Sequence, residues 1–139
     1  SARAHTWVGL QLKRQAEEEG DSAKLHEALE HFLEADRLYP GDVSALINIA
    51  IIYGQQGNLP EAERLLREAV RRRPNKADAH WNLAVCLHAQ ERYEEALEQI
   101  DKTLELDPRY RKAREAREQI RKMLGETPEY KVGTRGDSP

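Results

Sequence analysis

The stretch HWNLAVCLH, residues 80–88, holds the side chains best suited to chemistry in this chain. It contains the single cysteine, Cys86, with His88 two residues later and His80 six residues earlier. A thiol beside an imidazole is the arrangement of a cysteine nucleophile with its general base, and paired histidines are common zinc ligands. Each interpretation requires the side chains to meet in space, so the secondary structure of the stretch decides between them.

The spacing suits neither chemistry if the stretch is helical. Successive residues of an α-helix turn by about 100° and rise by about 1.5 Å. Cys86 and His88 would therefore point about 200° apart, and His80 and His88 would lie roughly 12 Å apart along the axis. His26 and His31, five residues apart, are also poorly placed to share a metal ion. We therefore predict no catalytic site, no metal site and no cofactor; the chain is not an enzyme, and Cys86 is a buried structural thiol.

The composition disfavours further classes of function. Of the 139 residues, 34% are charged and 6% aromatic, and the formal net charge of -3 argues against nucleic acid as a partner. The longest apolar run, ALINIAIIYG, is far shorter than the ~20 residues of a membrane helix, so we expect no membrane insertion. No signal-like segment opens the chain, although its start, SARAHTW, looks cut from a longer protein. A cytoplasmic location is favoured without being determined.

A 34-residue period organises most of the chain. Pro40, Pro74 and Pro108 are separated by this spacing. Four more columns keep the same register, and agreement of residue type in five columns indicates an internal repeat. These columns are Glu27, Glu61 and Glu95; Ala28, Ala62 and Ala96; Phe32, Leu66 and Ile100; and Leu25, Leu59 and Tyr93.

Each period predicts two helices. The stretch VSALINIAIIYGQQG carries apolar residues at helical spacing, and Gly57 supplies a left-handed turn that ends this helix. Asn58 can then cap a second helix at the amide of Glu61, with Pro60 in the first turn, where a missing amide hydrogen costs little. The alanine columns let helix axes approach closely, so a larger residue there would overpack the contact.

The residue types in these columns resemble those of the tetratricopeptide repeat (TPR) family. The period ADAHWNLAVCLHAQERYEEALEQIDKTLELDPRY is close to the family pattern throughout, and VSALINIAIIYGQQGNLPEAERLLREAVRRRPNK matches nearly as well. The resemblance implies an all-α fold, a right-handed superhelix of antiparallel helix pairs. It implies TPRs at residues 4–40, 43–76 and 77–108, the first irregular and with its turn lengthened by EEEGDSAK, then a capping helix at 109–124 and a mobile tail at 125–139.

By the same resemblance, the first helix of each repeat lines a concave groove that binds another protein. Asn48 and Asn82 are 34 residues apart, and an amide can both donate to and accept from a peptide backbone. The alternative is that these amides bond water or a neighbouring helix. The predicted groove residues are Ser44, Ile47, Asn48, Ile51 and Gln55 in the second repeat and Asp78, Trp81, Asn82, Val85 and His88 in the third.

The predicted groove departs from the TPR carboxylate clamp, which binds chaperone tails ending in Glu-Glu-Val-Asp. The clamp requires basic residues in the third repeat, where this chain has Asp78 and Asn82. Only Asn48 fits the clamp pattern, so a chaperone-tail receptor is disfavoured.

We therefore expect a protein–protein interaction scaffold that binds an extended peptide or a helix of its partner. Two alternatives stay open: repeat ends that stack into homo-oligomers, and a targeting module excised from a larger enzyme. The basic residues from Arg109 to Lys122 form either a solvated capping face or a contact for acidic partners. The tail sequence RGDSP matches an integrin-binding motif, which we interpret as a coincidence.

Overall fold

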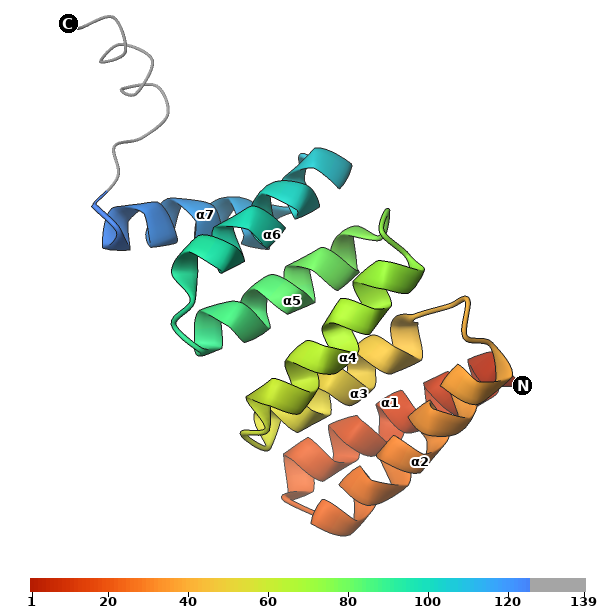
Figure 1. The fold of residues 1–139 in the computed structure, drawn as a ribbon. Helices are drawn as coiled ribbons and strands as arrows, with labels where there is room; N and C mark the ends of the chain where they lie inside the picture. Colours follow the sequence, from red (N-terminus) through yellow and green to blue (C-terminus); the bar gives the residue numbers. More distant parts are fainter. Residues whose placement is uncertain (126–139) are drawn as a thin grey trace, which may run out of the picture.

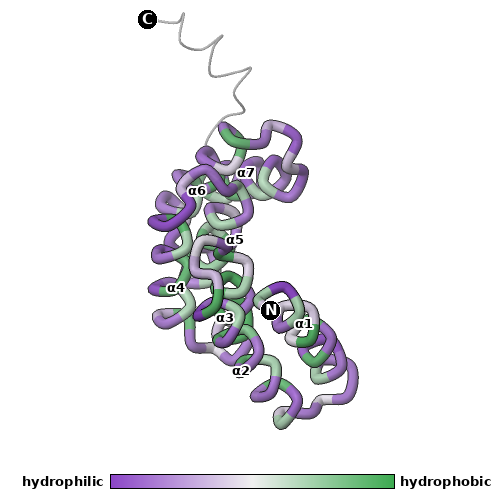
Figure 2. The backbone as a smooth tube through the Cα atoms, turned by 90° about the vertical axis from the view of Figure 1, so that its right-hand side faces the viewer, coloured by the Kyte–Doolittle hydropathy of each residue, from purple (hydrophilic) through white to green (hydrophobic). Residues whose placement is uncertain are grey.

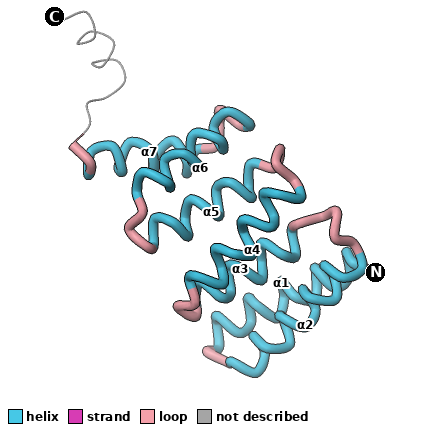
Figure 3. The backbone as a smooth tube through the Cα atoms, in the orientation of Figure 1, coloured by secondary structure: helices cyan, strands magenta, loops and turns pink. Residues whose placement is uncertain are grey.

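The computed structural model describes residues 1–125 of the chain (Figure 1). These residues form seven α-helices and no strand, joined by short loops (Figure 3). The prediction of an all-α fold is confirmed. The helices are α1 (Ala2–Glu19), α2 (Ser22–Leu38), α3 (Ser44–Gln55), α4 (Leu59–Arg72), α5 (Ala77–Ala89), α6 (Tyr93–Leu106) and α7 (Arg111–Met123).

The helices pack in chain order as a superhelix of antiparallel pairs. α1 packs on α2, α3 on α4 and α5 on α6, and each pair also contacts the helix that follows it. In the side view of Figure 2 the stack is curved, with α4 and α6 on its outer side and α1, α3 and α5 on its inner side. The first helices of successive repeats therefore lie along the inner side. No helix among the described residues is long and apolar enough to cross a membrane.

The repeat columns form the core of this stack. The alanine column at positions 28, 62 and 96 and the larger apolar column at positions 32, 66 and 100 are buried. The second and third repeats share one apolar cluster with α7, whereas the first repeat packs on α3 through a second cluster around Phe32 and Ile49. Small residues at the crossing points let the helices approach closely, as the period predicts.

The turns within the second and third repeats have the same backbone conformation but different residues. Gly57 has a φ of 84°, and the Asn58 side chain accepts a hydrogen bond from the Glu61 amide at 3.4 Å, which confirms the predicted turn and cap. In the third repeat the equivalent of Gly57 is Glu91, with a φ of 60°, and Arg92 makes no side-chain cap. Because Glu91 carries a Cβ in the left-handed region, the packing of the flanking helices must hold this turn.

The helices of the first repeat are longer than those of the other two repeats, and the turn between them is short. Gly20, with a φ of 66°, ends α1, and Asp21 caps α2 by accepting from the amides of Ala23 and Lys24 at 2.9 and 3.4 Å. The prediction that the residues EEEGDSAK lengthen the turn is therefore wrong, because most of them extend the two helices. α1 has 18 residues and α2 has 17, against 12 to 14 in the helices of the second and third repeats.

Gly9 sets the register of α1, which the sequence left open. A Cβ on Gly9 would lie 2.7 Å from the Phe32 ring, so only glycine permits this close approach. Gly9 is thus the counterpart of Ala50 and Ala84, the small buried residues of α3 and α5. It lies 41 rather than 34 residues before Ala50. The seven additional residues are close to two helical turns, so the helix faces stay in phase.

The capping helix lies within its predicted range. α7 packs on α6 and buries Ala113 and Ile120, which are 0% and 1% exposed. Gly125 ends it with a φ of 77°. The predicted tail beyond Gly125, including RGDSP, lies outside the described residues.

Candidate binding groove

The predicted groove residues lie on α3 and α5, the central helices of the inner side (Figure 2). Their burial and contacts differ widely, so they do not form one uniform surface. Five of them are on α3 (Ser44, Ile47, Asn48, Ile51 and Gln55) and five on α5 (Asp78, Trp81, Asn82, Val85 and His88).

The two asparagines make the same hydrogen bond in consecutive repeats. Nδ2 of Asn48 donates to the Ser44 carbonyl at 3.0 Å, and Nδ2 of Asn82 donates to the Asp78 carbonyl at 2.8 Å. Within residues 1–125 neither amide forms a hydrogen bond to a neighbouring helix. The alternative that these amides bond a neighbouring helix is therefore wrong. Each bond fixes the amide plane, so the Oδ1 acceptor has a defined direction at a half-buried site.

The predicted apolar floor is only partly accessible. Val85 is 46% exposed and Ile51 is half-buried, so both can contact a ligand. Ile47, in contrast, is 6% exposed and belongs to the apolar core. We therefore remove Ile47 from the contact residues, because a ligand would find almost no surface there. The apolar spacing could not distinguish the buried Ile47 from the half-buried Ile51, which lies four residues later.

Trp81 and Asp78 already have a partner, Tyr110, in the loop before α7. The Tyr110 hydroxyl donates to the Asp78 carboxylate at 2.7 Å, and its ring lies 5.7 Å from that of Trp81 in a tilted contact. Burial and, after it, this hydrogen bond raise the pKa of Tyr110 above its usual value. The half-buried Trp81 therefore joins the groove to the cap.

Gln55 and His88, at the C-terminal ends of α3 and α5, also contact other residues of the chain. Gln55 Nε2 donates to Glu17 Oε1 of α1 at 3.2 Å, which links the first two repeats across the inner side. A hydrogen bond from Lys13 is the main reason why the pKa of Glu17 is lowered. The His88 ring stands at 70° to that of Tyr93, an edge contact that orients the imidazole.

The first repeat contributes a pocket that sequence reasoning missed. It has a volume of about 340 Å³ at the junction of α1, the end of α2 and the start of α3. Only Ser44 of this lining belongs to the predicted groove. The signal that could have found the rest is the register of Gly9, which makes Trp7 the counterpart of Asn48. The lining residues are Ala2, Arg3, Thr6, Trp7, Leu10, Ala35, Tyr39, Asp42, Ser44 and Ala45.

The structure gives Cys86 and His80 packing roles. Cys86 is 6% exposed and its thiol donates to the Leu59 carbonyl at 3.5 Å, while burial raises the pKa of the thiol. His80 is 6% exposed, with Nδ1 2.8 Å from Gln99 Oε1 and Nε2 2.8 Å from the Pro74 carbonyl. Both imidazole nitrogens of His80 are therefore satisfied within the protein, and the thiol has no base beside it.

A histidine pair that the sequence did not suggest, His5 and His31, meets in space. Nδ1 of His5 on α1 lies 2.9 Å from Nδ1 of His31 on α2, with ring centroids 5.2 Å apart. The two rings therefore point head-on at each other, as in one N–H···N hydrogen bond. No group of three or more metal-binding side chains occurs among residues 1–125.

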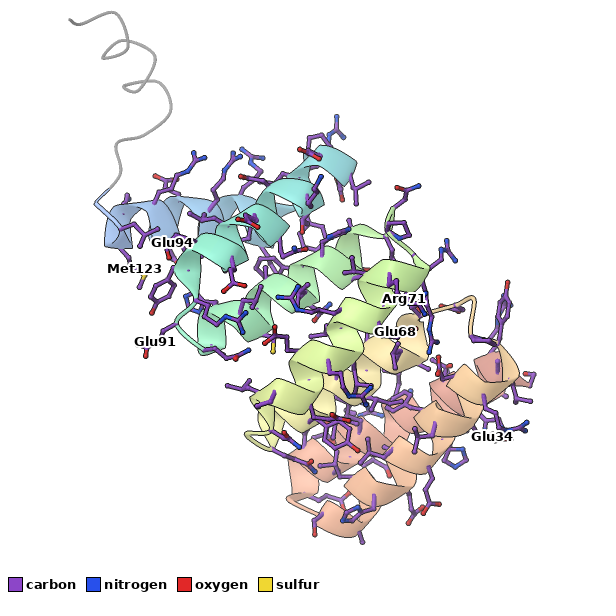
Figure 4. All side chains as sticks on the ribbon, viewed as in Figure 1. Glu34, Glu68, Arg71, Glu91, Glu94 and Met123 are labelled. Carbon is purple, nitrogen blue, oxygen red and sulfur yellow. The ribbon has the colours of Figure 1, made fainter. Side chains whose placement is uncertain are left out.

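The acidic residues of the outer surface pair with arginines. Glu68 accepts hydrogen bonds from Arg71 and Arg72, which lower its pKa to about 2 (Figure 4). Arg72 also reaches Asp36 of α2 at 2.9 Å, so it bridges two repeats. These pairs are solvated structural contacts rather than an acid–base site.

Comparison with known proteins identifies the fold family. The family model for the tetratricopeptide repeat matches residues 47–111. The Arabidopsis OM64 TPR domain superposes with a TM-score of 0.70 at 19% identity, covering 87% of this chain and 94% of that one. The first TPR of Spaghetti (RPAP3), bound to the HSP90 peptide SRMEEVD, gives 0.68 at 21% identity, covering 87% and 96%. Residues 47–111 thus match the tetratricopeptide repeat family, and the described helices have the fold of TPR domains.

Relatives in sequence cover only part of the TPR chain. Trafficking protein particle complex subunit 12 from mouse and from human is 34% identical over 70 residues, which is 50% of this chain. The match spans 9% of the mouse protein and 10% of the human one. The TPR fold and its peptide-bound structural neighbour support a role in protein–protein interaction.

Proposed function

We propose that the inner side of this TPR domain binds an extended peptide segment of a partner protein. The observation that carries the proposal is the repeated arrangement of Asn48 and Asn82, whose amides have the same orientation 34 residues apart. Beside them lie the accessible apolar residues Ile51 and Val85. An extended chain would place its amide N–H groups against the two Oδ1 acceptors and its apolar side chains between them.

Most of the binding free energy of such a peptide would have to come from apolar contacts. Two amide hydrogen bonds supply only about 1–3 kcal/mol together, whereas a micromolar complex requires about 8 kcal/mol. Ile51, Val85 and the exposed part of Trp81 are the candidates for the remainder. The asparagines would therefore set the register of the peptide, and the apolar residues would set its affinity.

The side chains of the groove disfavour a tail rich in carboxylates as the ligand. Asp78 stands where the carboxylate clamp places a basic residue, and its carboxylate accepts a hydrogen bond from the Tyr110 hydroxyl. The peptide named for the RPAP3 structure, SRMEEVD, is thus not the chemistry we propose for this chain.

The test is selection of binders from a random dodecapeptide library, followed by fluorescence-polarisation titration of the selected peptides. We expect Asn48→Ala together with Asn82→Ala to weaken binding by roughly 5- to 100-fold, which corresponds to 1–3 kcal/mol. Trp81→Ala should weaken it further. Asn75→Ala, which removes an exposed asparagine in the loop before α5, is the matched control. Equal affinity in the double variant and the control would remove the groove proposal.

Self-assembly through the ends of the stack is the second candidate function. The two ends expose different kinds of residue. Leu33 on α2 is 56% exposed at the N-terminal end, whereas the outward face of α7 at the other end is rich in arginine. Light scattering at several concentrations distinguishes the candidates, because a peptide-binding monomer keeps its mass. The role as a targeting module of a larger protein remains a hypothesis that the full reading frame would test.

A further inference from the structure

We propose that the pocket between α1, α2 and α3, called here the N-terminal pocket, accepts one large apolar side chain flanked by acidic residues. The N-terminal pocket is lined on its open side by Arg3, Trp7, Leu10, Tyr39, Asp42 and Ser44. The inference deepens the proposed function, because it assigns a sequence preference to one end of the groove.

Exposed aromatic side chains gather at this pocket. Trp7 is 62% exposed and Tyr39 is 60% exposed, and they are the only aromatic residues of segment 1–125 that are mainly exposed. The others are buried or half-buried. Two large aromatic rings facing water across one hollow are typical of a contact surface, because their burial by a ligand is strongly favourable.

The size of the pocket sets the size of its occupant. A volume of about 340 Å³ lies near the lower end of the range for ligand pockets in proteins. It therefore suits a single large side chain of a peptide rather than a folded segment. Aromatic and long aliphatic side chains fill such a space with the largest apolar contact area.

The charges around the pocket favour acidic neighbours. Arg3 has no acidic partner among residues 1–125, and the Arg73 guanidinium donates at 2.9 Å to the carbonyl of Gly41, which precedes the lining residue Asp42. The one carboxylate, Asp42, accepts from the Ser44 amide at 3.0 Å. That hydrogen bond, together with the nearby charges of Lys76 and Arg73, lowers the pKa of Asp42. The lining itself carries one positive residue, Arg3, and one negative residue, Asp42, and the positive charges of Arg73 and Lys76 lie near Asp42. These additional positive charges attract acidic residues beside the apolar one.

The N-terminal pocket continues the groove of the later repeats. With Gly9 as the counterpart of Ala50, Trp7 stands in the place of Asn48, and Leu10 in the place of Ile51. An extended peptide held by the asparagines of α3 and α5 would reach α1 next. At this end it would meet an aromatic wall in place of an amide.

The test uses Trp7 as its own reporter. The chain has two tryptophans, so Trp81→Phe leaves Trp7 as the single one. The probes are the blocked peptides Gly-Asp-Phe-Asp-Gly, Gly-Lys-Phe-Lys-Gly and Gly-Asp-Ala-Asp-Gly, titrated to about 10 mM while Trp7 fluorescence is recorded. We expect saturation by the first peptide in the millimolar range and at least ~10-fold weaker binding of the other two. Absence of saturation by the first peptide, or equal binding of the Asp- and Lys-flanked peptides, would overturn the proposal.

Variants separate this pocket from the rest of the groove. Arg3→Glu should reverse the preference between the Asp- and Lys-flanked peptides. In a chain that keeps Trp81, Trp7→Ala should weaken the Asp-flanked peptide by roughly 30-fold when binding is followed by NMR. Leu33→Ala, at an exposed residue outside the pocket, should leave binding unchanged. Library peptides that depend on Asn82 but not on Trp7 would refute the pocket and leave the groove proposal standing.

Discussion

α5 and α7 start 34 residues apart and occupy the same place in the repeat, yet within residues 1–125 only α5 packs on a helix at each side. Cys86 of α5 contacts α4, and His80 contacts Gln99 of α6. α7 keeps the first of these faces, because Ala113 and Ile120 are the counterparts of Ala79 and Cys86 and are buried against α6. The second face differs: the buried His80, Leu83, Ala84 and Leu87 of α5 are replaced in α7 by Arg114, Arg117, Glu118 and Arg121.

The difference shows that a helix can occupy a repeat position without providing a surface for the next helix. The period determines where a helix lies. Its forward face, the face on which the following helix would pack, determines whether the stack can continue. Burying three arginines and a glutamate against an apolar helix would carry a large desolvation cost. The forward face of α7 therefore ends the apolar stack, as expected for a capping helix.

The largest effect is expected when α7 is given the apolar forward face of α5. We expect Arg114→Leu, Arg117→Leu and Arg121→Leu together to cause self-association, because they expose a contiguous apolar stripe. Light scattering over a range of protein concentrations measures the change in mass. The same three residues changed to Gln form the control, which removes the charges but keeps a polar face. A mass identical to that of the wild type would contradict our account of the cap.

A matched pair of truncations compares the two forward faces in energy. Leu83→Ala on α5 should lower the free energy of unfolding by about 2–5 kcal/mol, because Leu83 is 1% exposed and its removal leaves a cavity. Arg117→Ala at the equivalent place on α7 should cost less than about 1 kcal/mol, since its contact with Asp101 is a partly exposed ion pair at 3.7 Å. Urea denaturation of both variants checks the difference. Similar losses would mean that α7 is packed as tightly as α5.

A smaller effect is expected at the contact between α5 and Tyr110, the residue before α7. Tyr110→Phe keeps the ring against Trp81 but removes the hydrogen bond to Asp78, which should cost about 1 kcal/mol at neutral pH. Because the folded pKa of Tyr110 is raised, its contribution is present below the ordinary tyrosine pKa of about 10 and is lost as the pH rises above it. The wild type should therefore lose more stability than Tyr110→Phe between pH 9 and pH 11, as thermal unfolding would show. Parallel pH profiles would indicate that the hydrogen bond is weak in solution.

The helices and much of the core could be predicted from the sequence because their signals are local. Apolar spacing, the Asn58 cap and the Gly57 turn depend on residues within a few positions of each other. Cys86 could be assigned to packing because its helical geometry separates it from His88. The first repeat was harder, since seven additional residues disrupt the 34-residue period without disrupting the helix faces.

The groove was less accessible to sequence reasoning because exposure depends on contacts between distant elements. Ile47 and Ile51 are both isoleucines on α3, yet the first is buried and the second half-buried. Tyr110 reaches Asp78 and Trp81 across 32 and 29 residues. Trp7 on α1 and Tyr39, directly after α2, line one pocket. No local pattern predicts these contacts.

The sequence by itself determined that this chain folds as stacked helix pairs, because the period, the caps and the alanine columns act over one or two helical turns. It also determined that the last helix carries a charged forward face. Only the tertiary structure decided which inner residues are accessible, that Tyr110 binds Asp78, and that a pocket with two exposed aromatic residues lies between α1, α2 and α3. The reason is physical: burial and charge environment are summed over neighbours that the chain brings together only when it folds.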